Sequence, residues 1–97
     1  MSLPDRDRAL AHRLIEQENG LLLDVRTPEE FASGHPEGAL NIPHDQVAAR
    51  LAELGDDKDR PVVIYCMKGG RAGLAKDVLV ANGFSKVTNV GGLSDYQ

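Results

Sequence analysis

Short apolar segments alternate with helical ones along this chain, and that alternation restricts it to few architectures. The clearest strand is residues 62–65, which are apolar, rich in β-branched side chains and preceded by Pro61. Shorter strands are expected at residues 21–25, 39–42 and 87–90. Alternating strands and helices favour an α/β fold, here a mostly parallel sheet of about four to five strands with helices on both faces.

Apolar side chains with helical spacing occupy the segments between these strands. Longer helices are expected over residues 4–18, 44–54 and about 71–82, where apolar residues recur every three or four positions. The residues that set this spacing are Leu10, Leu14, Val47, Leu51, Leu54, Leu74, Val78 and Ala81. A short helix is expected after Thr27, because Glu30 stands at the third helical position and completes a capping box.

The size and charge of the chain exclude several classes of protein. Its 97 residues are a one-domain length, so residues 1–97 are expected to form a single domain. Eleven Lys and Arg against fifteen Asp and Glu give a net charge of −4, which disfavours sequence-independent binding to nucleic acid or anionic membranes. The sequence has no apolar run of about 20 residues and no apolar leader, so a cytoplasmic location is expected. Cys66 is the only cysteine, which excludes an internal disulfide and a cysteine-based zinc cluster.

The segment after the clearest strand combines features that activate a thiol. Cys66 ends the strand, and Gly69 and Gly70 precede a helix that begins near Arg71. Unpaired amides at a helix start favour negative charge, and glycines let successive N–H groups converge on an anion. Lys68 and Arg71 add two cations, and each of these effects lowers the pKa of a cysteine. The pattern predicts a nucleophilic thiolate in an anion pocket, with backbone amides aimed at a sulfur that solvent can reach.

Other interpretations of the same segment have to be weighed. A single cysteine in a small domain is often a buried and inert apolar side chain. Lys68 taken alone also fits a solvated surface cation. The glycines at positions 69, 70 and 73 have neither the spacing of a dinucleotide fingerprint nor that of a phosphate-binding loop.

Several polar residues outside this segment are expected to have structural roles and not catalytic ones. Asp24 and Arg26 follow the first strand at its carboxyl end, where we expect a buried ion pair or hydrogen-bonded support for the cysteine loop. His35 lies in a turn and is expected to bond to the backbone, and His12 is expected at the surface. Glu30 is expected to be a solvated charge at a helix start.

Four segments, taken in order, resemble the rhodanese family of sulfurtransferases in its single-domain form. Residues 23–31 (LDVRTPEEF) and 34–43 (GHPEGALNIP) are similar to the first two signatures of the family. Residues 66–71 (CMKGGR) resemble its active-site loop, and residues 90–93 (VGGL) resemble its closing segment. No single segment is specific, but four at compatible spacing are.

The resemblance implies a ping-pong sulfurtransferase that needs no cofactor and no metal. The thiolate of Cys66 would take the outer sulfur of thiosulfate or a similar donor, and the resulting persulfide would pass it to cyanide or a cellular thiol. The substrate-binding residues implied are Met67, Lys68, Gly69, Gly70 and Arg71. The implied partners are a sulfane-sulfur donor and a thiophilic acceptor, and neither nucleic acid nor a membrane.

Two further hypotheses remain open. Phosphatases and arsenate reductases with a similar thiolate loop have one residue more between cysteine and arginine than the four that separate Cys66 from Arg71. A module that binds a partner protein, or a relay that accepts sulfur from a protein donor, is the other hypothesis. The chain also departs from the family pattern near its end, where Leu93 and Tyr96 stand in place of a common tryptophan.

Overall fold

The computed structural model describes residues 2–97, so Met1, which the expected domain includes, lies outside the described residues. Its centre is a four-stranded sheet in the order β2-β1-β3-β4, and every neighbouring pair is parallel. The strands are β1 (Leu21–Asp24), β2 (Leu40–Asn41), β3 (Val62–Cys66) and β4 (Val87–Gly92). The predicted parallel α/β architecture is confirmed, and each strand lies where the sequence pattern placed it.

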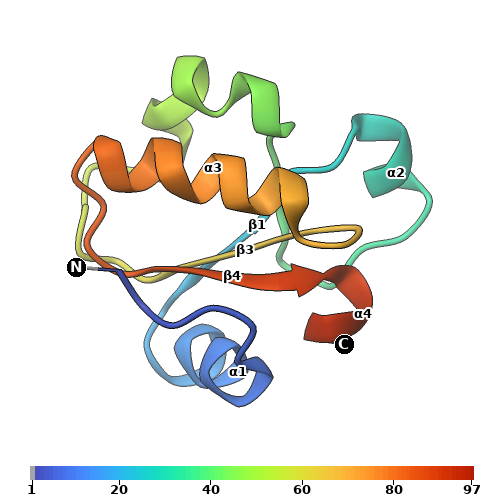
Figure 1. Cartoon of the computed structure of the whole chain (residues 1–97), viewed down its shortest axis with the longest axis horizontal. Coiled ribbons are helices and arrows are strands. Elements are labelled where there is room, and N and C mark those ends of the chain that lie inside the picture. Colours follow the sequence, from blue (N-terminus) through green and yellow to red (C-terminus); the bar gives the residue numbers. More distant parts are fainter. Residues whose placement is uncertain (1) are drawn as a thin grey trace.

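Helices cover both faces of the sheet (Figure 1). One face carries α3 (Gly70–Ala81) and the 3₁₀ helices η1 (His44–Gln46) and η2 (Ala48–Leu54). The other face carries α1 (Arg8–Gln17) and α4 (Leu93–Tyr96). The short helix α2 (Pro28–Ala32) lies near the carboxyl ends of the strands, where the β3–α3 loop also turns (Figure 1).

Alternating side chains of β3 hold the two helical layers on the sheet. Val62 and Ile64 belong to the apolar cluster on the α3 side, and Val63 and Tyr65 to the cluster on the α1 side. All of β3 is buried, as a strand with covered faces requires. Each fully buried aliphatic side chain contributes about 1.5–3 kcal/mol to folding, so β3 is a main source of stability.

The first helix is shorter than expected, because the chain before it pairs with β4 instead. Asp7 caps α1 by accepting a hydrogen bond from the N–H of Leu10 at 2.9 Å, and the helix begins at Arg8. Residues 2–6 run beside β4, where the N–H of Arg6 donates to the carbonyl of Asn89 at 2.8 Å. Pro4 therefore lies outside the helix, which corrects the prediction of a helix from residue 4.

The helix expected over residues 44–54 is two 3₁₀ helices. Arg50 leaves helical geometry at φ −120° and ψ 24°, and its side chain bonds to Gln46 and Glu53. Val47 and Leu54 both lie in the core on the α3 side. Their separation of seven positions is also that of two helical turns, so the apolar spacing resembled that of one continuous helix.

The buried face of α3 also differs from the expected one. Ala72, Ala75 and Leu79 face the sheet, whereas Leu74 is 58% exposed. Small alanines let the helix lie close above the sheet, and the helix is apolar on more than one side, so spacing alone could not select the face.

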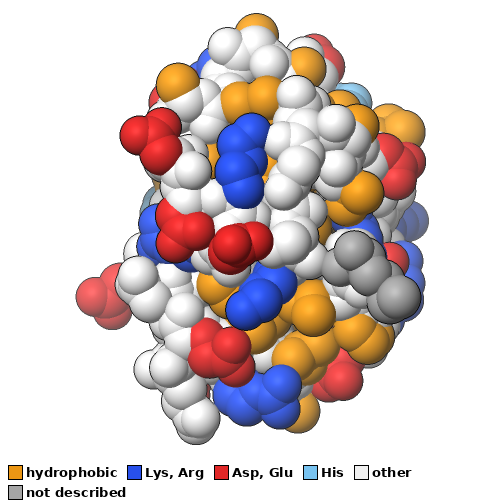
Figure 2. All heavy atoms as spheres, turned by 90° about the vertical axis from the view of Figure 1, so that its left-hand side faces the viewer, with side chains coloured by type: hydrophobic (Ala, Val, Ile, Leu, Met, Phe, Trp, Pro, Cys, Tyr) orange, Lys and Arg blue, Asp and Glu red, His pale blue; other side chains and the backbone are white. Residues whose placement is uncertain are grey.

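No helix within residues 2–97 has the length and apolarity to cross a bilayer. Figure 2 shows the end of the molecule away from the β3–α3 loop, where acidic and basic side chains are mixed and apolar ones lie between them.

Candidate active site

Cys66 is the last residue of β3 and lies directly before the loop that leads into α3. Its side chain belongs to the apolar cluster on the α3 side, so the sulfur lies beneath the start of that helix. The position matches the general rule that parallel α/β sheets use the carboxyl ends of their strands for ligands and chemistry.

Backbone amides of the loop and of the first turn of α3 converge on the sulfur. Sγ of Cys66 accepts hydrogen bonds from the N–H of Gly69 at 2.9 Å and from the N–H of Ala72 at 3.4 Å. Burial by itself raises the pKa of this thiol, but the amides of Ala72, Lys68, Gly69 and Arg71 together bring it below its ordinary value. The thiolate is therefore favoured at this position by backbone dipoles.

The sulfur lies deeper than the sequence pattern suggested. Cys66 is 1% exposed, whereas we expected a thiol open to solvent. The amides nevertheless point at the sulfur as expected. Met67 and Lys68, the two loop residues that follow Cys66, are exposed.

Of the two glycines in the loop, Gly69 is the one whose backbone requires glycine. Its φ is +107°, and a Cβ there would lie 2.4 Å from the Arg6 guanidinium. Gly70 does not have a left-handed φ, and a Cβ on it would meet nothing within 4 Å. The expectation that both glycines are needed for the bend is thus corrected. Gly92 is a second close approach, since a Cβ there would lie 2.1 Å from the carbonyl oxygen of Met67.

Arg71 is held by a carboxylate, which the sequence analysis did not foresee. Glu30 accepts two hydrogen bonds from its guanidinium, at 2.7 and 3.1 Å, and also completes the predicted capping box with Thr27. The expectation that Glu30 is merely solvated is wrong, because the first turn of α3 brings Arg71 against α2. Lys68 keeps an exposed position, as a surface cation would.

The Glu30–Arg71 pair predicts how stability depends on pH. The hydrogen bond from Arg71, assisted by the N–H of Thr27, lowers the pKa of Glu30 from 4.5 to about 2. The stability that this pair contributes is fully present above pH 4.5, and it is lost as the pH falls toward about 2. In urea unfolding across that range, we expect the Glu30→Gln variant to lose stability less steeply than the parent. Glu29→Gln, an exposed change on the same helix, is the matched control. Equal slopes for the parent and Glu30→Gln would contradict the assignment.

Asp24 and Arg26 form the expected buried ion pair. Their closest atoms are 2.7 Å apart, and their side chains are 0% and 3% exposed. The hydroxyl of Tyr65 donates to the same carboxylate, and burial with this bond raises the pKa of Tyr65. Arg26 also donates to the carbonyl of Gly34 at 2.8 Å and touches the sulfur of Met67 at 3.7 Å. The pair therefore connects the ends of β1 and β3 with the cysteine loop.

Two residues at the loop were missed in the sequence analysis. The side-chain amide of Asn89 donates to the carbonyl of Gly69 at 3.0 Å, and Arg6 donates to the carbonyl of Lys68 at 3.1 Å. A polar amide inside an apolar strand is unusual and was a usable signal for Asn89. Nothing local marks Arg6, because its partner lies 62 positions away.

The side chains of His12 and His35 bond elsewhere than to the amide cradle, the set of backbone N–H groups that surround Sγ of Cys66. His35 donates from Nδ1 to the carbonyl of Phe31 at 2.7 Å and stacks on the Phe31 ring, as expected for a turn histidine. His12 is only partly exposed, since it stacks on Tyr96, so its predicted surface position holds in part. Tyr96 itself is buried and also stacks on Tyr65, so it occupies core space near the end of the chain.

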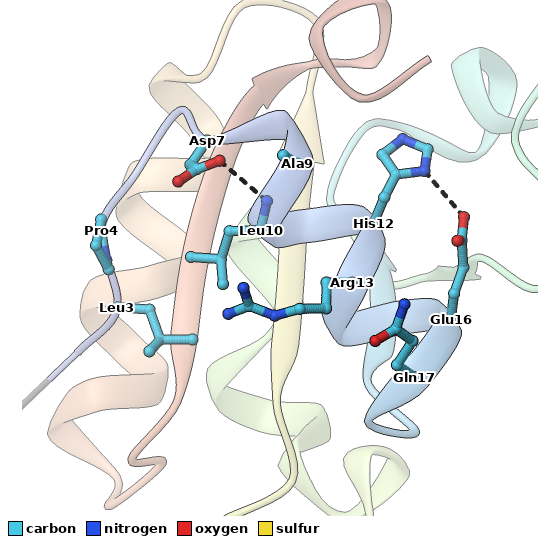
Figure 3. A pocket seen from close by; sticks show the side chains of 9 residues that line it. All are labelled: Leu3, Pro4, Asp7, Ala9, Leu10, His12, Arg13, Glu16 and Gln17. Atoms are coloured by element: carbon cyan, nitrogen blue, oxygen red, sulfur yellow. Dashed lines mark hydrogen bonds and ion pairs between the residues drawn. The ribbon is translucent and has the colours of Figure 1, made fainter.

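A shallow depression along α1 contains none of the cysteine-loop residues (Figure 3). It is lined by Leu3, Pro4, Asp7, Ala9, Leu10, His12, Arg13, Glu16 and Gln17. Within residues 2–97, no group of three or more His, Cys, Asp or Glu side chains is arranged to hold a metal ion.

The parallel sheet and the cradled thiol define an α/β protein with an activated cysteine at the end of a central strand. The model of the rhodanese-like domain matches residues 7–97, and the chain belongs to that family. Two of its similar relatives are named for sulfur transfer, and two others are named as tRNA uridine(34) hydroxylases.

Thiosulfate sulfurtransferase PspE of Escherichia coli K12 is 42% identical over 73 residues, which cover 75% of this chain and 70% of PspE. A sulfurtransferase of Allochromatium vinosum is 40% identical over 84 residues, which cover 87% of this chain and 77% of the relative. A solved structure described as a rhodanese with anions from E. coli is similar with a TM-score of 0.74 and 41% identity. That similarity covers 78% of this chain and 89% of the solved one.

Proposed function

We propose that residues 1–97 act as one domain that transfers a sulfane sulfur from thiosulfate or a similar donor to a thiophilic acceptor through Cys66. The observation that carries this proposal is the pair of N–H groups, from Gly69 and Ala72, aimed at Sγ of the strand-end cysteine. They stabilise the thiolate before the first half-reaction and again when the second half-reaction returns the electron pair to Sγ. The names of the sulfurtransferase relatives support the same chemistry.

The first half-reaction is a displacement at sulfur. The Cys66 thiolate attacks the outer sulfur of thiosulfate and forms a new S–S bond. The S–S bond of thiosulfate breaks, and sulfite leaves with the bonding electron pair. Exposed Lys68 attracts the anionic donor, and the loop amides from Met67 to Arg71 hold the persulfide anion.

The second half-reaction regenerates the thiolate. Cyanide or a cellular thiolate attacks the outer sulfur of the persulfide, and the electrons of that S–S bond return to Sγ of Cys66. The chemistry resides in the cysteine itself, so the proposal calls for no cofactor. Asp24 and Arg26 support the loop from β1 and do not contact the reacting atoms.

The ion pair of Arg71 favours sulfur transfer over phosphatase chemistry. A phosphoryl group presents several oxygens that have to be bound during the reaction, and Arg71 is the residue expected to bind them. Glu30 already takes two of its hydrogen bonds, at 2.7 and 3.1 Å. The cradle that remains consists of backbone amides around a single sulfur, which suits a persulfide.

Intact-mass measurement after incubation with thiosulfate tests the proposal. We expect the protein to gain the mass of one sulfur atom, and cyanide to remove it while thiocyanate forms. The same measurement is then repeated with a series of small thiols as acceptors in place of cyanide. No mass gain with thiosulfate, combined with cysteine-dependent hydrolysis of an aryl phosphate, would replace sulfur transfer by the phosphatase hypothesis.

A further inference from the structure

The chain before α1 is fastened to the edge of the sheet and to α3. Residues 2–6 run beside β4, with the N–H of Arg6 donating to the carbonyl of Asn89 at 2.8 Å. Asp5 accepts a hydrogen bond from the N–H of Asn89 at 3.0 Å and forms an ion pair with Lys76 of α3. The hydrogen bonds to β4 and the ion pair with α3 therefore fix the position of Asp5 and Arg6 next to the cysteine loop.

Arg6 turns its side chain from this segment onto the loop. Its φ is +58°, in the left-handed region that residues other than glycine rarely adopt. One guanidinium nitrogen donates to the carbonyl oxygen of Lys68 at 3.1 Å. The same group fills the space where a side chain on Gly69 would lie. A strained backbone, held by Asn89, thus places a cation against the outside of the loop.

The carbonyl that Arg6 binds and an N–H that binds the sulfur belong to one peptide group. A trans peptide is planar, and its C=O and N–H point in opposite directions. The carbonyl of Lys68 points outward to Arg6, so the N–H of Gly69 points inward to Sγ of Cys66, at 2.9 Å. The next carbonyl, that of Gly69, accepts from the Asn89 side chain at 3.0 Å and from the N–H of Gly73 at 2.9 Å, so the loop is held at a second point.

We propose that Arg6 is a positioning residue for Cys66, and that its guanidinium holds and polarises the Lys68–Gly69 peptide so that the N–H of this peptide stabilises the sulfur anion. The family model begins at residue 7, so Arg6 lies outside the part of the chain that it matches. The value of this contact for turnover rests on the proposed function, whereas its effect on the thiol does not.

Other charges near these groups stay constant when Arg6 alone is replaced. Arg8 and, on α4, Asp95 lie beside Arg6 around a shallow depression. On the thiol side, the guanidinium of Arg71 is paired with Glu30, and Lys68 lies on the loop itself. Arg8 donates to the carbonyl of Gln97 and not to the loop, so its replacement removes an equal charge close by and serves as a matched control.

Alkylation kinetics of the single thiol test the proposal without any need for turnover. The rate of iodoacetamide modification is measured by intact mass across pH for the parent, Arg6→Gln, Arg6→Met and Arg8→Gln. We expect either Arg6 variant to raise the titration midpoint by about half a pH unit and to slow modification about threefold below the midpoint. The Arg8→Gln profile is expected to match that of the parent. Thermal unfolding identifies which Arg6 variant keeps the parent fold, and that variant decides the outcome.

Two results would overturn the inference. One is a parental midpoint in the folded Arg6 variants, and the other is an equal shift in Arg8→Gln, which would reduce the effect to bulk charge. The experiment also separates this inference from the proposed function. A shifted midpoint in a protein that takes no sulfur from thiosulfate removes only the function, and sulfur uptake without a shift removes only the role of Arg6.

Discussion

The Cys66→Ser variant is expected to lose at least about three orders of magnitude in the rate of thiocyanate formation from thiosulfate and cyanide. Serine places an oxygen where the amides of Gly69 and Ala72 now meet sulfur. A hydroxyl does not ionise near neutral pH and forms no persulfide, so the first half-reaction has no nucleophile. Because Cys66 is the only cysteine, no other thiol of the chain can replace it.

The loss has to arise from the chemistry and not from unfolding. The serine oxygen accepts hydrogen bonds from the same amides, so we expect its thermal unfolding midpoint to stay near that of the parent. Intact mass after thiosulfate should show no added sulfur in Cys66→Ser and one sulfur in Glu53→Gln, an exposed change on η2. Full turnover by Cys66→Ser would exclude Cys66 as the sulfur carrier.

Asp24→Asn is expected to destabilise the fold by about 3–5 kcal/mol, since it removes one partner of a buried ion pair and leaves the other charge unpaired. Arg26 is 3% exposed, its guanidinium gives three hydrogen bonds to the Asp24 carboxylate, its backbone N–H gives a fourth, and Tyr65 gives a fifth. The amide of asparagine is close in shape to the carboxylate but turns a donor toward the guanidinium. This loss is a large part of the stability of about 5–15 kcal/mol that a small domain has.

Urea unfolding with a matched ion-pair variant measures the effect. Glu53 pairs with Arg50 at 2.6 Å on the surface, so Glu53→Gln also removes one carboxylate from an arginine pair. We expect a much smaller loss there, because water screens exposed pairs and solvates the remaining charge. Similar losses in Asp24→Asn and Glu53→Gln would show that burial of the Asp24–Arg26 pair is not what makes it important.

Local sequence patterns predicted the elements whose determinants are close together in the chain. The β3 strand follows from a run of β-branched residues, and the start of α2 follows from Thr27 and Glu30, three positions apart. The position of Cys66 before a glycine turn and a helix is local in the same sense. The start of α1 was predicted wrongly at residue 4, because pairing with β4 outweighed a local preference for helix.

The sequence by itself determined the parallel α/β fold, the family and the cysteine at the end of a central strand. Hydrophobic periodicity, helix capping and loop motifs each depend on residues only a few positions apart, so they can be recognised in the sequence. Only the tertiary structure decided which partners surround that cysteine. Glu30 meets Arg71 across 41 positions, and Arg6 meets Lys68 across 62. Such pairs form only when strands adjacent in the sheet bring distant segments to one edge, and no local spacing encodes which charges then meet.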